Sequence, residues 1–97
     1  MRADVVELVA LREEVGARVR ALLVDRLGVR CEPGAIDPDA ALFCALGLDS
    51  VDAIELVVAV EAELGVSLPD GEEASLVLHS VSRIVDHVVA ARAGGVS

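Results

Sequence analysis

Apolar residues recur at every third or fourth position over much of the chain, a spacing typical of amphipathic helices. The first such segment predicts a helix from Val5 to Leu27, with a core face at Val5, Leu8, Leu11, Val15, Val19, Leu22, Leu23 and Leu27. Gly28 comes directly after it and suits the left-handed conformation found just past a helix end. We therefore expect the first helix to end at Gly28.

The segment 29–49 has a different character. Pro33, Gly34 and Pro38 prevent a continuous helix across its first half. A loop this long in a small domain has to be held against the core. The pattern predicts one short turn at residues 40–46 and apolar anchors at Ile36, Leu42, Phe43, Leu46 and Leu48.

A second helix is predicted from Ser50 to Leu64, with Ser50 as its N-cap. Turn residues at 69–71 precede a short third helix from Glu72 to Leu78. Ser80 can cap the last helix, which Gly94 and Gly95 end. Its core face would be Val81, Ile84, Val85 and Val88, and its outward residues Arg83, Asp86 and His87.

These elements predict an all-α fold, an antiparallel four-helix bundle with a long first loop and a short third helix. The length of 97 residues suits a single domain covering residues 1–97. Residues 1–12 extend the first helix, either as further helical turns or as a frayed end, and residues 93–97 are expected to form a flexible tail.

The second helix has three distinct faces when its residues are placed 100° apart. Its core arc contains Leu56, Val60, Ala53, Leu64 and Val57. An acidic face contains Glu55, Ala59, Asp52 and Glu63. A second apolar strip consists of Ile54, Val58, Val51 and Ala62. The pattern alone favours packing of this strip under the loop or the third helix over a contact surface, because exposed apolar patches are uncommon.

The chain has seventeen acidic and eight basic residues, a net charge of −9. This charge repels nucleic acids and anionic membranes and favours proteins with basic docking patches. Cys31 and Cys44 lie outside any metal or redox motif and are expected to be free, buried thiols. No apolar run has signal-peptide or membrane-span form. We expect a cytoplasmic monomer that does not insert into membranes.

Known catalytic patterns do not match the sequence. His79 and His87 have no partners at metal-ligand spacing, so both are interpreted as surface or half-buried residues. Ser50 has no neighbouring His or Lys that would make it a catalytic nucleophile. Asp37 and Asp39 are not followed by the remaining calcium-loop ligands. The sequence therefore predicts neither a metal site nor an enzyme.

The string GLDSVDAIEL, residues 47–56, resembles the phosphopantetheine attachment motif of acyl carrier proteins. The order and spacing of elements resemble that family from about Val15 to Ala90. The resemblance implies that a phosphopantetheinyl transferase uses coenzyme A to attach 4'-phosphopantetheine to the Ser50 hydroxyl, with Asp49 and Asp52 presenting charge to that enzyme. The terminal thiol would then carry an acyl group as a thioester, and the acyl chain would lodge between helices two, three and four.

The resemblance also implies partners: acyl-loading enzymes, ketosynthases and related fatty-acid or type II polyketide enzymes with basic patches. The implied docking residues are Val51, Asp52, Ile54, Glu55, Val58, Glu61 and Glu63. The chain departs from the family at Ala62, at Val51 and in a longer stretch over residues 69–81. Two alternatives remain open, an aminoacyl or peptidyl carrier and an unmodified acidic adaptor.

Overall fold

The computed structural model describes residues 2–69 and 71–94. Within these ranges the α-helices are α1 Arg2–Asp25, α2 Leu42–Leu46, α3 Ser50–Leu64, α4 Glu72–Val77 and α5 Val81–Gly94, with a single 3-10 turn, η1 Pro33–Ala35. The predicted all-α bundle is confirmed, and α2 occupies the predicted short turn. Of the predicted C-terminal tail, residues 95–97 lie outside the described ranges.

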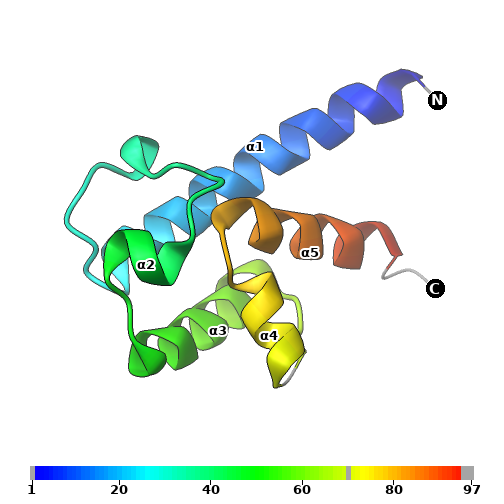
Figure 1. Ribbon diagram of the computed structural model, residues 1–97. Coiled ribbons are helices and arrows are strands. Elements are labelled where there is room, and N and C mark those ends of the chain that lie inside the picture. The colour runs from blue at the N-terminus through cyan, green and yellow to red at the C-terminus, as the bar shows by residue number, and fades with distance from the viewer. Residues whose placement is uncertain (1, 70, 95–97) are drawn as a thin grey trace.

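The long helix α1 crosses the molecule, and α5 packs beside it in the opposite direction (Figure 1). α3 packs against the second half of α1, and the short α4 precedes α5 (Figure 1). Aliphatic side chains from α1, α2, α3 and α5 meet in one core, which includes Val15, Val19, Leu23, Leu42, Leu56, Val60, Ile84 and Val88. Such burial is the main force that holds the helices together.

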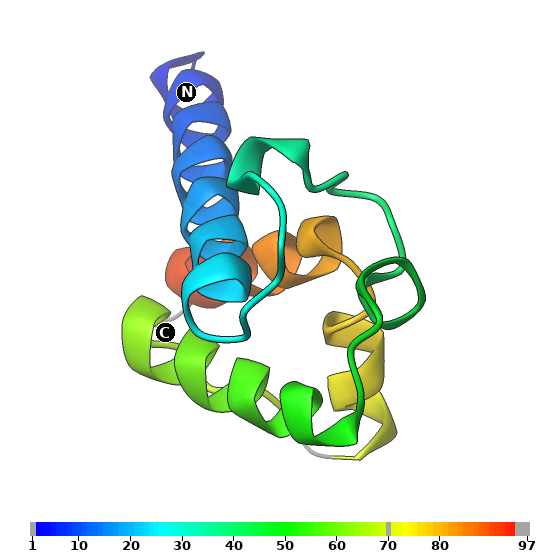
Figure 2. The same cartoon turned by 90° about the vertical axis from the view of Figure 1, so that its left-hand side faces the viewer.

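The first turns of α1 project beyond the other helices (Figures 1 and 2). Val5 is 63% exposed and Leu8 is 43% exposed, so the prediction that they belong to the core is wrong. Periodicity indicates which side of a helix is apolar, but it does not indicate how far the neighbouring helix extends. Here the helical extension begins at Arg2, and full burial begins only at Val15.

The end of α1 has the predicted glycine geometry. Gly28 has a φ of +74°, a conformation that only glycine adopts without strain. The Val29 N–H donates to the Leu23 carbonyl at 3.1 Å, which satisfies one of the open carbonyls of the last turn. The predicted role of Gly28 is confirmed.

The segment between α1 and α3 is tied to the start of α5 by backbone hydrogen bonds. The Leu42 N–H donates to the His79 carbonyl and the Ser82 N–H to the Pro38 carbonyl, each at 2.8 Å. Ile36 and Leu42 are buried. The remaining predicted anchors pack against the core as partly buried residues, namely Phe43, Leu46 and Leu48. These contacts hold the loop in place, so the chain enters α3 from a fixed position (Figure 2).

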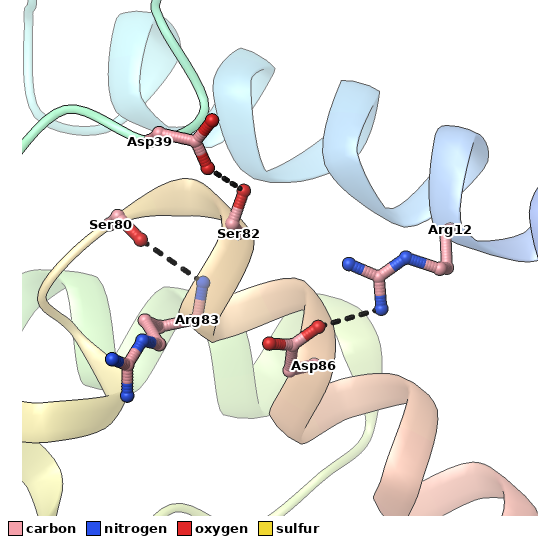
Figure 3. Close-up of polar contacts among 6 residues, drawn as sticks. All are labelled: Arg12, Asp39, Ser80, Ser82, Arg83 and Asp86. Atoms are coloured by element: carbon pink, nitrogen blue, oxygen red, sulfur yellow. Dashed lines mark hydrogen bonds and ion pairs between the residues drawn. The ribbon is translucent and has the colours of Figure 1, made fainter.

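Ser80 caps α5 as predicted. Its buried hydroxyl oxygen accepts a hydrogen bond from the Arg83 N–H at 3.2 Å (Figure 3). Arg83 and Asp86 point outward, as expected. His87, which was expected to point outward, is half-buried, and its Nε2 lies 2.8 Å from the Ser67 carbonyl oxygen of the loop between α3 and α4.

Candidate functional site

The start of α3 is organised by two aspartates. The Asp49 carboxylate accepts from the Asp52 N–H at 2.9 Å, and the Asp52 carboxylate accepts from the Asp49 N–H at 3.0 Å. Asp49 is therefore the N-cap, and Ser50 is the first residue of the helix. The prediction that Ser50 is the N-cap is wrong, because the preceding carboxylate takes that position. The three-residue spacing of the two aspartates is the sequence signal for this reciprocal cap.

This arrangement leaves the Ser50 side chain free. Ser50 is exposed, and no hydrogen bond to its hydroxyl forms within the described residues. Gly47, with a φ of +68°, ends α2 and turns the chain toward α3. Half-buried Leu48 then packs against the core between this turn and the cap. The result is a serine hydroxyl on a fixed helix end, open to a second protein.

The backbone around Ser50 suits a phosphate ester. Within the described part of the chain, the N–H groups of Ser50 and Val51 have no hydrogen-bond acceptor, whereas those of Asp52 and Ala53 donate to Asp49. Open N–H groups and the positive end of a fifteen-residue helix favour an anion at this place. The residues present thus fit a phosphodiester on the Ser50 oxygen.

The second apolar strip lies on the surface. Val51 is 67% exposed, Ile54 66% and Val58 56%, and Ala62 is exposed as well. The interpretation that favoured packing of this strip under the loop or α4 is wrong. The buried side of α3 instead includes Ala59, which was assigned to the acidic face.

The acidic residues after Ser50 differ in their surroundings. Glu55 is exposed and forms no ion pair within the described residues. Glu61 accepts a hydrogen bond from the Leu68 N–H at 2.9 Å, which holds the loop after α3. Glu63 pairs with Arg26, in the turn just after α1, at 2.6 Å. Sequence reasoning missed both internal contacts, and the Arg26 partner lies 37 positions away with no local signal.

None of the cysteines and histidines belongs to α3. Cys31 and Cys44 are free thiols, but Cys31 is half-buried and Cys44 is exposed, so the prediction of two buried thiols is wrong. His79 is exposed and contributes its backbone carbonyl to the loop. In the described ranges, no three His, Cys, Asp or Glu residues are grouped so that they could hold a metal ion.

Comparison with known proteins identifies the class. The family described as "Phosphopantetheine attachment site" matches residues 17–88, a range that includes the whole of α3 and the GLDSVDAIEL string. The chain therefore belongs to the phosphopantetheine attachment family, whose members carry this group covalently.

Relatives within this class narrow the identification. An acyl carrier protein of Zymomonas mobilis subsp. mobilis (strain ATCC 31821 / ZM4 / CP4) is 40% identical over 76 residues, covering 76% of this chain and 95% of that protein. An acyl carrier protein of Bradyrhizobium sp. (strain ORS 278) is 44% identical over 57 residues, covering 59% of this chain and 70% of that protein. The chain is a member of the acyl carrier protein family, whose members are carriers and not catalysts.

Among the helices described, none is both long and apolar enough to cross a bilayer.

Proposed function

We propose that Ser50 is the attachment residue and that the chain presents acyl thioesters on its 4'-phosphopantetheine arm to enzymes of fatty-acid or type II polyketide synthesis. The observation that carries this proposal is that two neighbouring residues have different roles at the start of α3. Asp49 caps the helix, and Ser50 keeps an exposed hydroxyl. The arm supplies a terminal thiol that holds the acyl group in activated form. The chain itself supplies the anchoring oxygen and the rigid helix end.

The local charges also support a role for Asp49 and Asp52. Their carboxylates flank Ser50 and are exposed or half-exposed, although each also accepts a backbone hydrogen bond. A modifying transferase with a basic surface can approach this acidic end from solvent. The backbone N–H groups of Ser50 and Val51 then stabilise the phosphodiester once it has formed.

The docking surface follows from the exposed strip and the free carboxylate beside it. Val51, Ile54 and Val58 offer apolar contact, and Glu55 offers a negative charge that no described residue pairs with. We propose that these residues, with Asp52, dominate docking. Glu61 and Glu63 were also expected to face partners, but we assign them a smaller share because each has an internal contact.

An apolar hollow offers room for the acyl chain. A space of about 580 Å³ lies beside α4 and the loop after α3, lined by Ser67, Leu68, Pro69, Glu73, Leu76, Val77 and His87. We propose that longer acyl chains reach into this region. Lengthening the acyl chain on the loaded protein should shift the amide resonances of Leu76 and Val77, and a pattern that stays unchanged with chain length would contradict the proposal.

The decisive experiment is mass spectrometry after incubation with coenzyme A and a broad-specificity phosphopantetheinyl transferase. The natural sequence and the control Ser75→Ala, which alters an exposed serine on α4, should gain the mass of one phosphopantetheine. Ser50→Ala should gain none. A chain that never gains this mass would be an unmodified adaptor, and modification of Ser50→Ala would place the arm elsewhere.

A second measurement addresses the cargo. The modified protein should accept an acyl group from an acyl-loading enzyme as a hydroxylamine-sensitive thioester, with little loading by an aminoacyl-loading enzyme. Preferential aminoacyl loading would assign the chain to peptidyl carriers.

We also keep the cytoplasm as the expected location, since Cys31 and Cys44 are both free thiols.

A further inference from the structure

The first turns of α1 contain an exposed apolar segment that the proposed carrier site does not use. Residues 5–11 read VVELVAL, in which Glu7 is the one polar residue. The large aliphatic side chains of this segment are exposed to the following extents: Val5 63%, Val6 69%, Leu8 43% and Val9 52%. The family match begins only at residue 17. Attachment of phosphopantetheine therefore does not account for this segment.

The apolar surface of residues 5–11 is much wider than a stripe that faces a core. At 100° per residue, its apolar positions cover an arc of about 260°, from Leu11 round the helix to Ala10. Glu7 occupies the remaining side. A surface helix of a globular protein typically has an apolar stripe of roughly 100°, and a helix that is apolar on nearly all sides is typically buried. The width of the arc thus predicts an occupant that contacts several sides of the helix.

The bundle covers none of these sides at residues 5–9. Leu8 lies seven residues before Val15 and so faces nearly the same way, but Val15 is buried in the core and Leu8 is exposed. Val6 faces nearly the opposite way. The first turns of α1 project beyond the other helices, so both sides are open to a second molecule (Figures 1 and 2).

The free charges described on the first half of α1 are acidic. Glu7 and Glu13 are exposed and form no ion pair with a described residue, whereas Arg12 is paired with Asp86. The chain as a whole carries a net charge of −9. These charges attract a surface with Lys or Arg side chains and repel an anionic lipid surface. The favoured occupant is therefore a basic protein.

A second copy of this chain fits the segment poorly. Two α1 helices laid side by side would contact each other on one side only and leave most of the arc exposed. Residues 5–11 are about 10 Å long, and helices that touch over so short a length bury well below the roughly 1,200 Å² of a stable interface. Such a contact would also bring together two chains that each carry −9. A groove in another protein avoids these costs because it encloses the helix.

We propose that residues 5–11 of α1 dock in an apolar groove of another protein, with Lys or Arg side chains at the rim of the groove. The groove contacts Val6 and Val9 on one side of the helix and Leu8 on the other, and a basic side chain at the rim pairs with Glu7. Insertion of an apolar helix into a groove is a common mode of recognition. Because α3 lies away from this end of α1, it stays open to the carrier's enzymes (Figure 1).

The first test identifies the occupant. The full chain with Val6→benzoylphenylalanine is expressed in the cells that make the natural protein and is irradiated there. It should cross-link to one protein, which mass spectrometry identifies. The matched probe is Ala17→benzoylphenylalanine, at an exposed position on the same side of α1, and it should not capture that protein.

The second test measures binding of the purified partner to the full chain. The double variant Val6→Ser, Val9→Ser should raise the dissociation constant at least about tenfold. Glu7→Lys should raise it as well, and added salt should weaken the binding of the natural sequence. Val58→Ser, which alters the exposed strip of α3, is the control and should bind as the natural sequence does.

Four results would overturn the proposal: no cross-link at Val6 beyond that at Ala17, a cross-link only to lipid, a cross-link to a second copy of the chain, and unchanged affinity in the double variant. A stronger effect of Val58→Ser would place the contact on α3. Thermal unfolding shows whether each variant is folded. The double variant should gain phosphopantetheine as the natural sequence does, so the outcome is independent of the proposal for Ser50.

Discussion

Asp49 and Asp52 cap the same helix end reciprocally, each carboxylate accepting a hydrogen bond from the backbone N–H of the other residue. This pair fixes the orientation of the helix without using the intervening serine. A residue that must accept a covalent group can therefore sit one position inside the helix, exposed to solvent, while its neighbours satisfy the backbone.

The cap predicts different costs for neighbouring substitutions. Asp49→Ala should lower the free energy of unfolding by about 1 kcal/mol, because it removes the N-cap acceptor. Ser50→Ala should change it by less than about 0.5 kcal/mol, as expected for an exposed side chain that forms no hydrogen bond with the described residues. Urea denaturation of both variants measures this, with Glu55→Ala as an exposed control on the same helix. A larger loss in Ser50→Ala than in Asp49→Ala would contradict the cap assignment.

Glu55 and Glu63 of α3 should have different roles, Glu55 in docking and Glu63 in stability. Glu55→Gln should slow modification by the transferase several-fold at low salt, because it removes a charge available for docking. Glu63→Gln should affect modification less and lower the free energy of unfolding by at most about 1 kcal/mol, the usual value for a surface ion pair such as that with Arg26. Initial modification rates at several salt concentrations test this. If Glu63→Gln slows docking more than Glu55→Gln, the proposed surface is misplaced.

Glu61 should hold the loop after α3. Glu61→Ala leaves the partly buried Leu68 N–H without its acceptor and should lower the free energy of unfolding by about 1 to 3 kcal/mol. Glu61→Gln keeps an acceptor oxygen and should lose less. Hydrogen exchange at the Leu68 amide should become faster in the alanine variant than in the glutamine variant. Equal exchange rates in the two variants would show that this bond does not protect the loop.

Gly16 should be replaceable at a gain in stability. Gly16→Ala should raise the free energy of unfolding by about 0.5 to 1 kcal/mol, because glycine is unfavourable inside a helix and the new methyl group makes an ordinary contact with Val85. Gly28→Ala is the matched control and should destabilise the chain, since the φ of Gly28 is +74°. Thermal unfolding measures both. A destabilised Gly16→Ala would mean that α1 and α5 cannot accept a methyl group between them.

Much of the local structure could be predicted from short-range signals. The bounds of α3, the ends at Gly28 and Ser80 and the anchors of the long loop follow from turn chemistry and apolar spacing within a few residues. The string around Ser50 likewise identified the class of protein before any geometry was known, because its order and spacing are specific. The cap was the exception, since Asp49 and Ser50 are both competent N-cap residues and the choice depends on which side chain meets the Asp52 N–H.

The long-range arrangement required the tertiary structure. Periodicity assigned Val5 and Leu8 to a core that does not reach them, and the apolar pattern favoured burial of Ile54 and Val58, which are exposed. A helical wheel gives directions around one axis, whereas burial depends on where other helices begin and end. Likewise, only the folded chain brings Glu63 to Arg26. Short-range signals thus specified the helices and supported the proposal of Ser50 as the attachment residue, and the packing of α1 against α3 and α5 decided which of their side chains are buried, paired or exposed.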